Sequence, residues 1–216
     1  MAKIISITHG KNRIDCLLSG TLGDKVYCVR KVIQYTRSRP VHTLKSKSAA
    51  QLDQSAKFTS TLKFLQPLKG FLRVGFKTEH PTMSPFNAAM SYNFKNALTG
   101  TYPHYEIDYS KVRVSQGNLP GALNPAVSLI SAGEIKFTWD DNRHAMATNR
   151  VLLVLYNSSK QKAEFIVYGN TRFSESQVVT LPETFVGDEV QCYIGFQNYQ
   201  RSVFSDSQFI GSLIVA

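Results

Sequence analysis

The segment WDDNRH brings together residue types that bind metal ions. It sets Asp140, Asp141 and His144 within five residues, and carboxylate and imidazole groups are common zinc ligands. The same Asp-Asp-Asn run between two apolar segments is also ordinary turn chemistry, because Asp and Asn tolerate the backbone angles of a turn. We therefore expect a turn here, with no metal ion and no other cofactor.

A second group of reactive side chains lies in TYPHYEIDY, which holds three tyrosines, one histidine and two carboxylates. Alternation along a strand would place Tyr105, Ile107 and Tyr109 on a packed face, with Glu106 and Asp108 on a solvated face. A sugar-binding or other ligand-binding aromatic site is the alternative. The packed strand is the interpretation we favour.

The chain lacks the motifs of common enzyme classes. It contains no G-x-S-x-G, P-loop, G-x-G-x-x-G or H-E-x-x-H sequence. Cys16, Cys28 and Cys192 form no C-x-x-C pair, which is typical of small buried hydrophobic residues rather than a disulfide framework or a zinc site. We predict that the protein is not an enzyme, and we predict no catalytic residue and no small-molecule substrate.

Positive charge gathers in the N-terminal third. Residues 1–80 hold 15 Lys/Arg and 4 Asp/Glu, a net charge of +11, whereas residues 81–216 hold 10 and 11, a net charge of −1. Within KVYCVRKVIQYTRSRP we expect one basic edge strand that binds a protein partner through Lys25, Tyr27, Val29, Lys31, Ile33 and Tyr35. A second set is expected to contact an anionic partner or nucleic acid: Arg30, Arg37, Arg39, Lys45 and Lys47.

Helices must follow these strands. Ser48 is a suitable N-cap for an amphipathic helix over 48–77, which Pro67 should divide in two near Leu65. A second helix is predicted over 84–99, with Ser84 as its N-cap and Gly100 at its end. These segments form a helical hairpin.

From residue 105 the apolar period changes from helical to alternating. About seven short strands, separated by turn residues, are typical of an immunoglobulin-like or fibronectin-III-like β-sandwich with Trp139 in its core. We thus predict a mainly β protein with a helical segment (α+β). Residues 1–104 would form a basic N-terminal region with strands over 3–36 and helices, and residues 105–216 the sandwich.

Several stretches resemble a family of uncharacterised Bacteroidota proteins of similar size: SAAQLDQSAKF, FNAAMSYNFKNALTGTYPHYEIDYSKVRVSQGNLPGALNPAV, FTWDDN, GDEVQCYIGF and SDSQFIGS. The resemblance runs along most of the chain and implies no specific activity, because that family has no known function. The segment SAAQLDQSAKF also resembles a motif of phage-encoded β-sandwich proteins, although the proline of that motif is absent from LKSKSAAQ.

Three functions remain open at this stage. We favour a structural or interaction protein that self-assembles as a homo-oligomer or docks on a larger assembly, such as a phage virion or a surface structure. The alternatives are a nucleic-acid-binding protein and a glycan-binding or other ligand-binding sandwich module. The N-terminus shows no apolar run of a secretory signal and the sequence no membrane span, so we expect synthesis in the cytoplasm. The final location stays open, with a virion or another assembled particle as one option.

Overall fold

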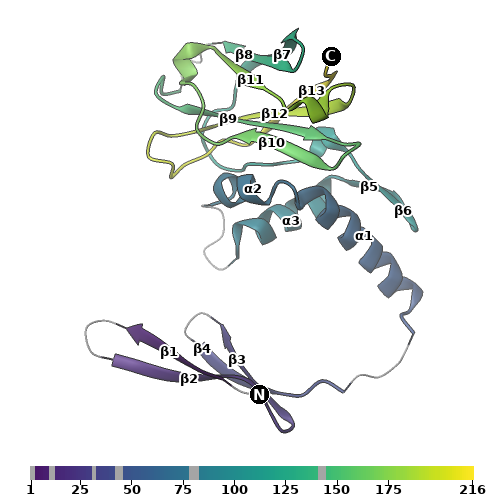
Figure 1. The fold of residues 1–216 in the computed structure, drawn as a ribbon, viewed down its shortest axis with the longest axis vertical. Helices are drawn as coiled ribbons and strands as arrows, with labels where there is room; N and C mark the ends of the chain where they lie inside the picture. Colours follow the sequence, from purple (N-terminus) through teal and green to yellow (C-terminus); the bar gives the residue numbers. More distant parts are fainter. Residues whose placement is uncertain (1–2, 10–12, 31–32, 42–45, 78–82, 141–144) are drawn as a thin grey trace. The chain divides into compact units, whose positions relative to one another are not determined.

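Four antiparallel strands make up the first 47 residues. The computed structural model describes residues 3–9, 13–30, 33–41, 46–77, 83–140 and 145–216. Residues 1–47 form one unit and residues 48–216 a second. The strands of the first unit pair in the order β1–β2–β3–β4 (Figure 1): β1 (Lys3–His9), β2 (Arg13–Leu22), β3 (Lys25–Arg30) and β4 (Ile33–Ser38).

Local sequence signals set the ends of the helices, as predicted. The Ser48 hydroxyl accepts a hydrogen bond from the Gln51 N–H, and the Gln51 side chain accepts one from the Ser48 N–H, which completes a capping box. The Ser84 hydroxyl caps the Asn87 N–H in the same way. Pro67 lies in the break between the first two helices. The helices are α1 (Ala49–Leu65), α2 (Lys69–Gly75) and α3 (Pro85–Asn96).

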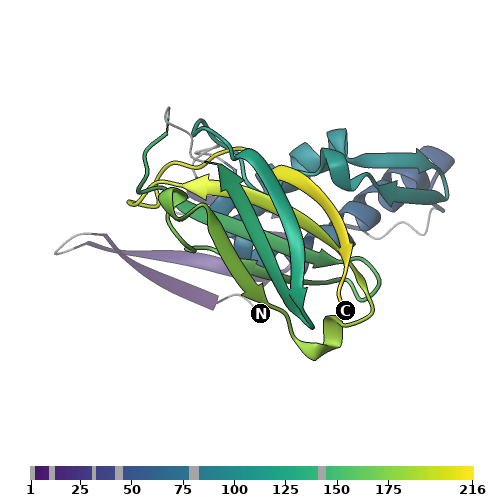
Figure 2. The same cartoon turned by 90° about the horizontal axis from the view of Figure 1, so that it is seen from above.

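Seven strands of the second unit form the predicted immunoglobulin/fibronectin-III-like sandwich. One sheet has the order β10–β9–β12–β13 and the other the order β11–β8–β7, with the two sheets face to face (Figure 2). The strands are β7 (Leu123–Ser131), β8 (Glu134–Asp140), β9 (Arg150–Asn157), β10 (Lys162–Ile166), β11 (Ser176–Thr180), β12 (Glu189–Gln197) and β13 (Gln208–Ile214).

A small hairpin between α3 and the sandwich differs from the prediction. It consists of β5 (Leu98–Thr101) and β6 (His104–Ile107), followed by a 3-10 turn, η2 (Tyr109–Lys111). Gly100 does not end α3 but lies in this hairpin, with φ +91°, where an added Cβ would lie 2.5 Å from the His104 carbonyl oxygen. Only glycine fits such a backbone position without strain. The strand predicted from residue 105 onward is also shorter than expected: it ends at Ile107, and the 3-10 turn η2 follows it.

The central strands are buried on both faces, which makes the second unit three layers deep. On β9, Leu152, Val154 and Tyr156 pack against the helices, whereas Leu153 and Leu155 pack between the two sheets. The sequence indicates this arrangement through the run VLLVLY, because a strand that is buried on both faces has apolar residues at consecutive positions. The predicted core position of Trp139 is confirmed, since its ring is 2% exposed.

The helices therefore belong with the sandwich. The division between units falls at residues 47 and 48, not at the expected boundary of 104 and 105. The physical reason is the apolar face of α1, α2 and α3, which buries Phe64, Leu68 and Phe71 in one cluster with residues of β9 and β12. Within the described ranges, no helix combines the length and the hydropathy that crossing a membrane requires.

Candidate functional site

The β3–β4 hairpin divides the predicted partner-binding residues between two faces. The chain reverses between Arg30 and Ile33, so that two short antiparallel strands replace the single long strand expected there. Directly opposed residues share a face. Tyr35 pairs with Cys28, so Ile33 and Tyr35 lie on the opposite face from Tyr27. The expectation that all these residues share one face is wrong. It assumed that side chains alternate along one continuous strand, whereas the chain reverses between β3 and β4.

One face of this hairpin is the more apolar, and we call it the Ile33 face. Two of its side chains are largely open to solvent, since Ile33 is 70% exposed and Tyr35 is 47% exposed. All described side chains of β4 are exposed. The described side chains of the Ile33 face are Val26, Cys28, Ile33, Tyr35 and Arg37, and the backbone of Arg30 pairs with Ile33.

Two of these residues, Val26 and Cys28, were absent from the predicted site. Both lie half-buried on β3, opposite Arg37 and Tyr35. Finding them requires knowing that a hairpin forms. The sequence gives no sign of the reversal, because Lys31 and Val32 are not residues that mark a tight turn.

The edges of the first unit are open. β4 pairs with β3 along six residues and with no other strand in the part of the chain that is described. β2 pairs with β1 along seven residues but meets β3 at only three positions, Gly20, Thr21 and Leu22. The unit is thus mainly two hairpins joined by a short ladder, and two-stranded hairpins are marginally stable in water.

Neither buried hydrophobic cluster includes this unit. Both clusters formed by the described side chains lie between Phe64 and Val215. Within the first unit, the described residues add no helix and no second sheet to the four strands. A sheet is stable when a face is buried against another layer. The exposed Ile33 face and the open β4 edge together form a surface suited to a partner.

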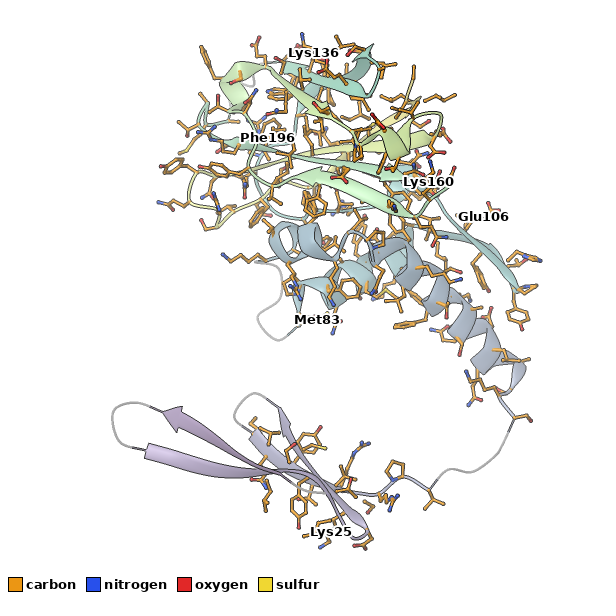
Figure 3. All side chains as sticks on the ribbon, viewed as in Figure 1. Lys25, Met83, Glu106, Lys136, Lys160 and Phe196 are labelled. Carbon is orange, nitrogen blue, oxygen red and sulfur yellow. The ribbon has the colours of Figure 1, made fainter. Side chains whose placement is uncertain are left out.

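Positive charge surrounds this surface. The side chains of Lys25, Arg37, Arg39 and Lys47 are exposed (Figure 3 labels Lys25), and the Arg39 N–H donates to the Asp24 carbonyl at the base of the hairpin. Of the other residues predicted to contact an anionic partner, Arg30 lies on β3 with only its backbone described, and Lys45 lies outside the described residues. Lys31, predicted to bind a protein partner, also lies outside them.

The second unit offers little for metal chemistry in the ranges that the structure describes. There, no group of three His, Cys, Asp or Glu side chains comes together. Asp140 ends β8, is exposed, and accepts a hydrogen bond from Asn124 Nδ2 at 2.7 Å. Asp141 and His144, with the predicted turn, lie outside the described residues. Burial raises the pKa of the Cys192 thiol to about 12, so this cysteine stays protonated.

Comparison with known proteins gives this architecture a family. A family model described as "Family of unknown function (DUF6266)" matches residues 17–211. The chain belongs to DUF6266. The match spans the second half of the N-terminal strands, all three helices and nearly the whole sandwich.

The other comparisons give DUF6266 no function. No curated protein matches this chain. Among solved structures, one titled "Myokine structure" is 14% identical, with a TM-score of 0.37, over 45% of this chain and 98% of its own. The fn3 domain of human contactin 1 is 16% identical, with a TM-score of 0.33, over 47% of this chain and 85% of its own.

Proposed function

We propose that this DUF6266 protein is a non-enzymatic structural protein that assembles through its N-terminal hairpins. The observation that carries the proposal is the Ile33 face, an exposed apolar surface beside an unpaired strand edge in a unit with no described second layer. Chains near 47 residues rarely stabilise themselves without a further layer, a disulfide, a metal or a partner. A neighbouring chain would supply the missing layer.

A strand edge gives such a contact both affinity and direction. Main-chain N–H and C=O groups along β4 would pair with a strand of the neighbour, while Ile33 and Tyr35 fill its apolar surface. Net charge disfavours contact between two N-terminal units more strongly than a head-to-tail contact between unlike units. Residues 1–47 hold 10 Lys/Arg and 2 Asp/Glu, a net charge of +8, while residues 48–216 hold 15 and 13, a net charge of +2. Contact between two N-terminal units would be repulsive.

A head-to-tail contact repeats from chain to chain. Its product is a ring when the rotation closes and a filament when it does not. The sequence resemblance to Bacteroidota and phage-encoded proteins favours a virion or a surface structure as the setting. Docking on a larger assembly uses the same surface.

Two double variants of one strand test the proposal. Ile33→Glu with Tyr35→Glu places two carboxylates on the Ile33 face, whereas Gln34→Glu with Thr36→Glu places the same charge on the opposite face. By light scattering on a sizing column, we expect the first variant to be a monomer of about 24.2 kDa and the second to assemble like the wild type. Equal masses for the two variants would argue against this surface.

Nucleic acid is the second candidate partner. The specific observation is the exposed Arg37 beside Tyr35 on one face of a two-stranded ribbon, a combination of phosphate-binding and base-stacking groups. Arg37→Glu with Arg39→Glu should then abolish retention on single-stranded DNA at low salt. Wild-type protein that is not retained under those conditions would exclude this role.

A further inference from the structure

A polar-lined cavity of about 410 Å³ lies within the second unit. Its walls come from α1, from β6 and η2, and from the turn that joins β9 to β10. Figure 3 labels Glu106 on β6 and Lys160 in that turn, which lie on the same side of this unit. A volume of this size falls in the range of small-ligand sites.

One wall of the cavity is aromatic. Phe64 and Tyr156 meet edge to face with ring centroids 4.8 Å apart, and Tyr109 lies 6.0 Å from each. The rings therefore pack on one another and form a wall rather than an open cage. Tyr105 contributes a fourth ring, and its hydroxyl donates to the Asp53 carboxylate, which holds the ring in place.

Tyr156 carries a polar group that the fold does not use. Its side chain is 3% exposed and lines the cavity, yet its hydroxyl makes no hydrogen bond to any residue that the structure describes. The oxygen is not sealed from the cavity, so a molecule bound there can pair with it. Burial raises the pKa of Tyr156 to about 12, so the phenol is neutral and offers both a donor and an acceptor.

Apart from Ile107, the remaining lining groups are polar and balanced in charge. Ser60, Ser158 and Gln161 supply hydroxyl and amide groups, and Lys63 with Glu106 adds one charge of each sign. We propose that this cavity binds a neutral carbohydrate, with a sugar ring against the half-buried rings of Tyr105 and Tyr109 and a sugar hydroxyl bonded to Tyr156. Aromatic rings present the apolar faces that match the C–H face of a sugar, while the polar groups match its hydroxyls.

Other ligand classes fit less well. A quaternary ammonium ion would meet a cation already in place, because Lys57 Nζ lies 5.4 Å from the ring centroid of Tyr105. Lys63 would also repel a cation at the cavity wall. A phosphate group is usually bound by several cationic hydrogen-bond donors, whereas Lys63 is the one cation among the described residues of this lining and the Glu106 carboxylate would repel the phosphate. A fatty chain would leave the hydroxyl of Tyr156 unpaired.

A saccharide titration of the full chain tests this site. Glucose, galactose, mannose, N-acetylglucosamine and their β-linked disaccharides are added in turn to ¹⁵N-labelled protein, with choline and inorganic phosphate as comparison ligands. We expect a saccharide to shift the amide signals of Glu106 and Gln161. Tyr156→Phe should weaken that binding about tenfold, as the loss of one hydrogen bond to the ligand predicts.

The control is Tyr199→Phe, which removes the same hydroxyl from an exposed tyrosine outside the cavity lining and should leave the affinity unchanged. Tyr156→Phe should also unfold at the wild-type temperature or above it, because the hydroxyl it removes has no partner in the fold. Three results would each overturn the proposal: no shift with any saccharide of the panel, wild-type affinity in Tyr156→Phe, or displacement of the saccharide by choline or phosphate.

Discussion

Arg172 is a cation placed where an arginine is rarely found. Its side chain is fully buried, and its guanidinium donates to the carbonyl oxygens of Pro120 and Gly121 at 2.7 and 2.8 Å. The same group lies 3.6 Å from the ring centroid of Phe196, and the Arg172 carbonyl accepts from the Trp139 indole. Arg172 therefore holds the segment that precedes β7, at Pro120 and Gly121, against the core between the two sheets.

Replacing this arginine tests that role. Arg172→Lys keeps the charge, but an ammonium group cannot span both carbonyl oxygens or stack on Phe196 as a planar guanidinium does. We expect a loss of about 3 kcal/mol in the free energy of unfolding, measured by urea denaturation. Arg201→Lys is the control, because Arg201 is exposed over the Tyr168 ring and should change stability by less than about 0.5 kcal/mol. Similar losses in both variants would contradict the account.

Sequence could not point to Arg172. An arginine in TRFSES resembles any charged residue of a surface turn, and charged side chains are mostly exposed. Its partners lie 51 and 52 residues away along the chain, so only the fold brings them together. The Tyr156 hydroxyl was missed for the same reason: VLLVLYN looks like an ordinary core strand.

Among the elements, α2 packs unusually close to the segment that follows η2. An added Cβ at Gly75 would lie 2.5 Å from the Val114 carbonyl oxygen and 2.9 Å from Ser115 Cβ. The Gly75 carbonyl also accepts from the Gln116 N–H at 3.0 Å. The missing side chain at residue 75 thus lets the helix and this segment meet.

Two glycines of one helix make a matched pair of variants. Gly75→Ala should destabilise the protein by about 1–3 kcal/mol, because backbone atoms must move to admit the methyl group. Gly70→Ala meets only the end of the Phe165 side chain, at 3.1 Å, and alanine improves helix propensity. We therefore expect Gly70→Ala to be neutral or stabilising in urea denaturation. Equal destabilisation of the two variants would show that close backbone contact is not the cause.

Elements with local signals were predictable from the sequence, and elements without them were not. Ser48, Pro67 and Ser84 set the helix ends through contacts within a few residues, so the sequence alone predicts them. The β3–β4 reversal carries no turn residue and was missed. The β5–β6 hairpin was missed because Gly100 is also a normal helix terminator.

At the scale of the whole molecule, the boundary between residues 47 and 48 separates most of the net positive charge from the buried hydrophobic clusters. Residues 1–47 carry most of the net positive charge, and residues 48–216 contain both buried clusters. The charge asymmetry was visible in the sequence. Packing of the helices against the sandwich was also expected, but the sheet that they cover was not predictable, since it depends on which of two faces each side chain of β9 and β12 takes. We expect the well-packed second unit to fold without the first, and we propose that a partner stabilises the first unit.

The central claim is that assembly depends on the N-terminal unit, and sizing with light scattering tests it most directly. The full chain and residues 48–216 would each be measured at low and high salt, with absorbance at 260 and 280 nm. We predict a full chain well above 24.2 kDa with a protein-like absorbance ratio, and a monomeric 48–216 fragment. A monomeric full chain, or a fragment that still assembles, would contradict the account.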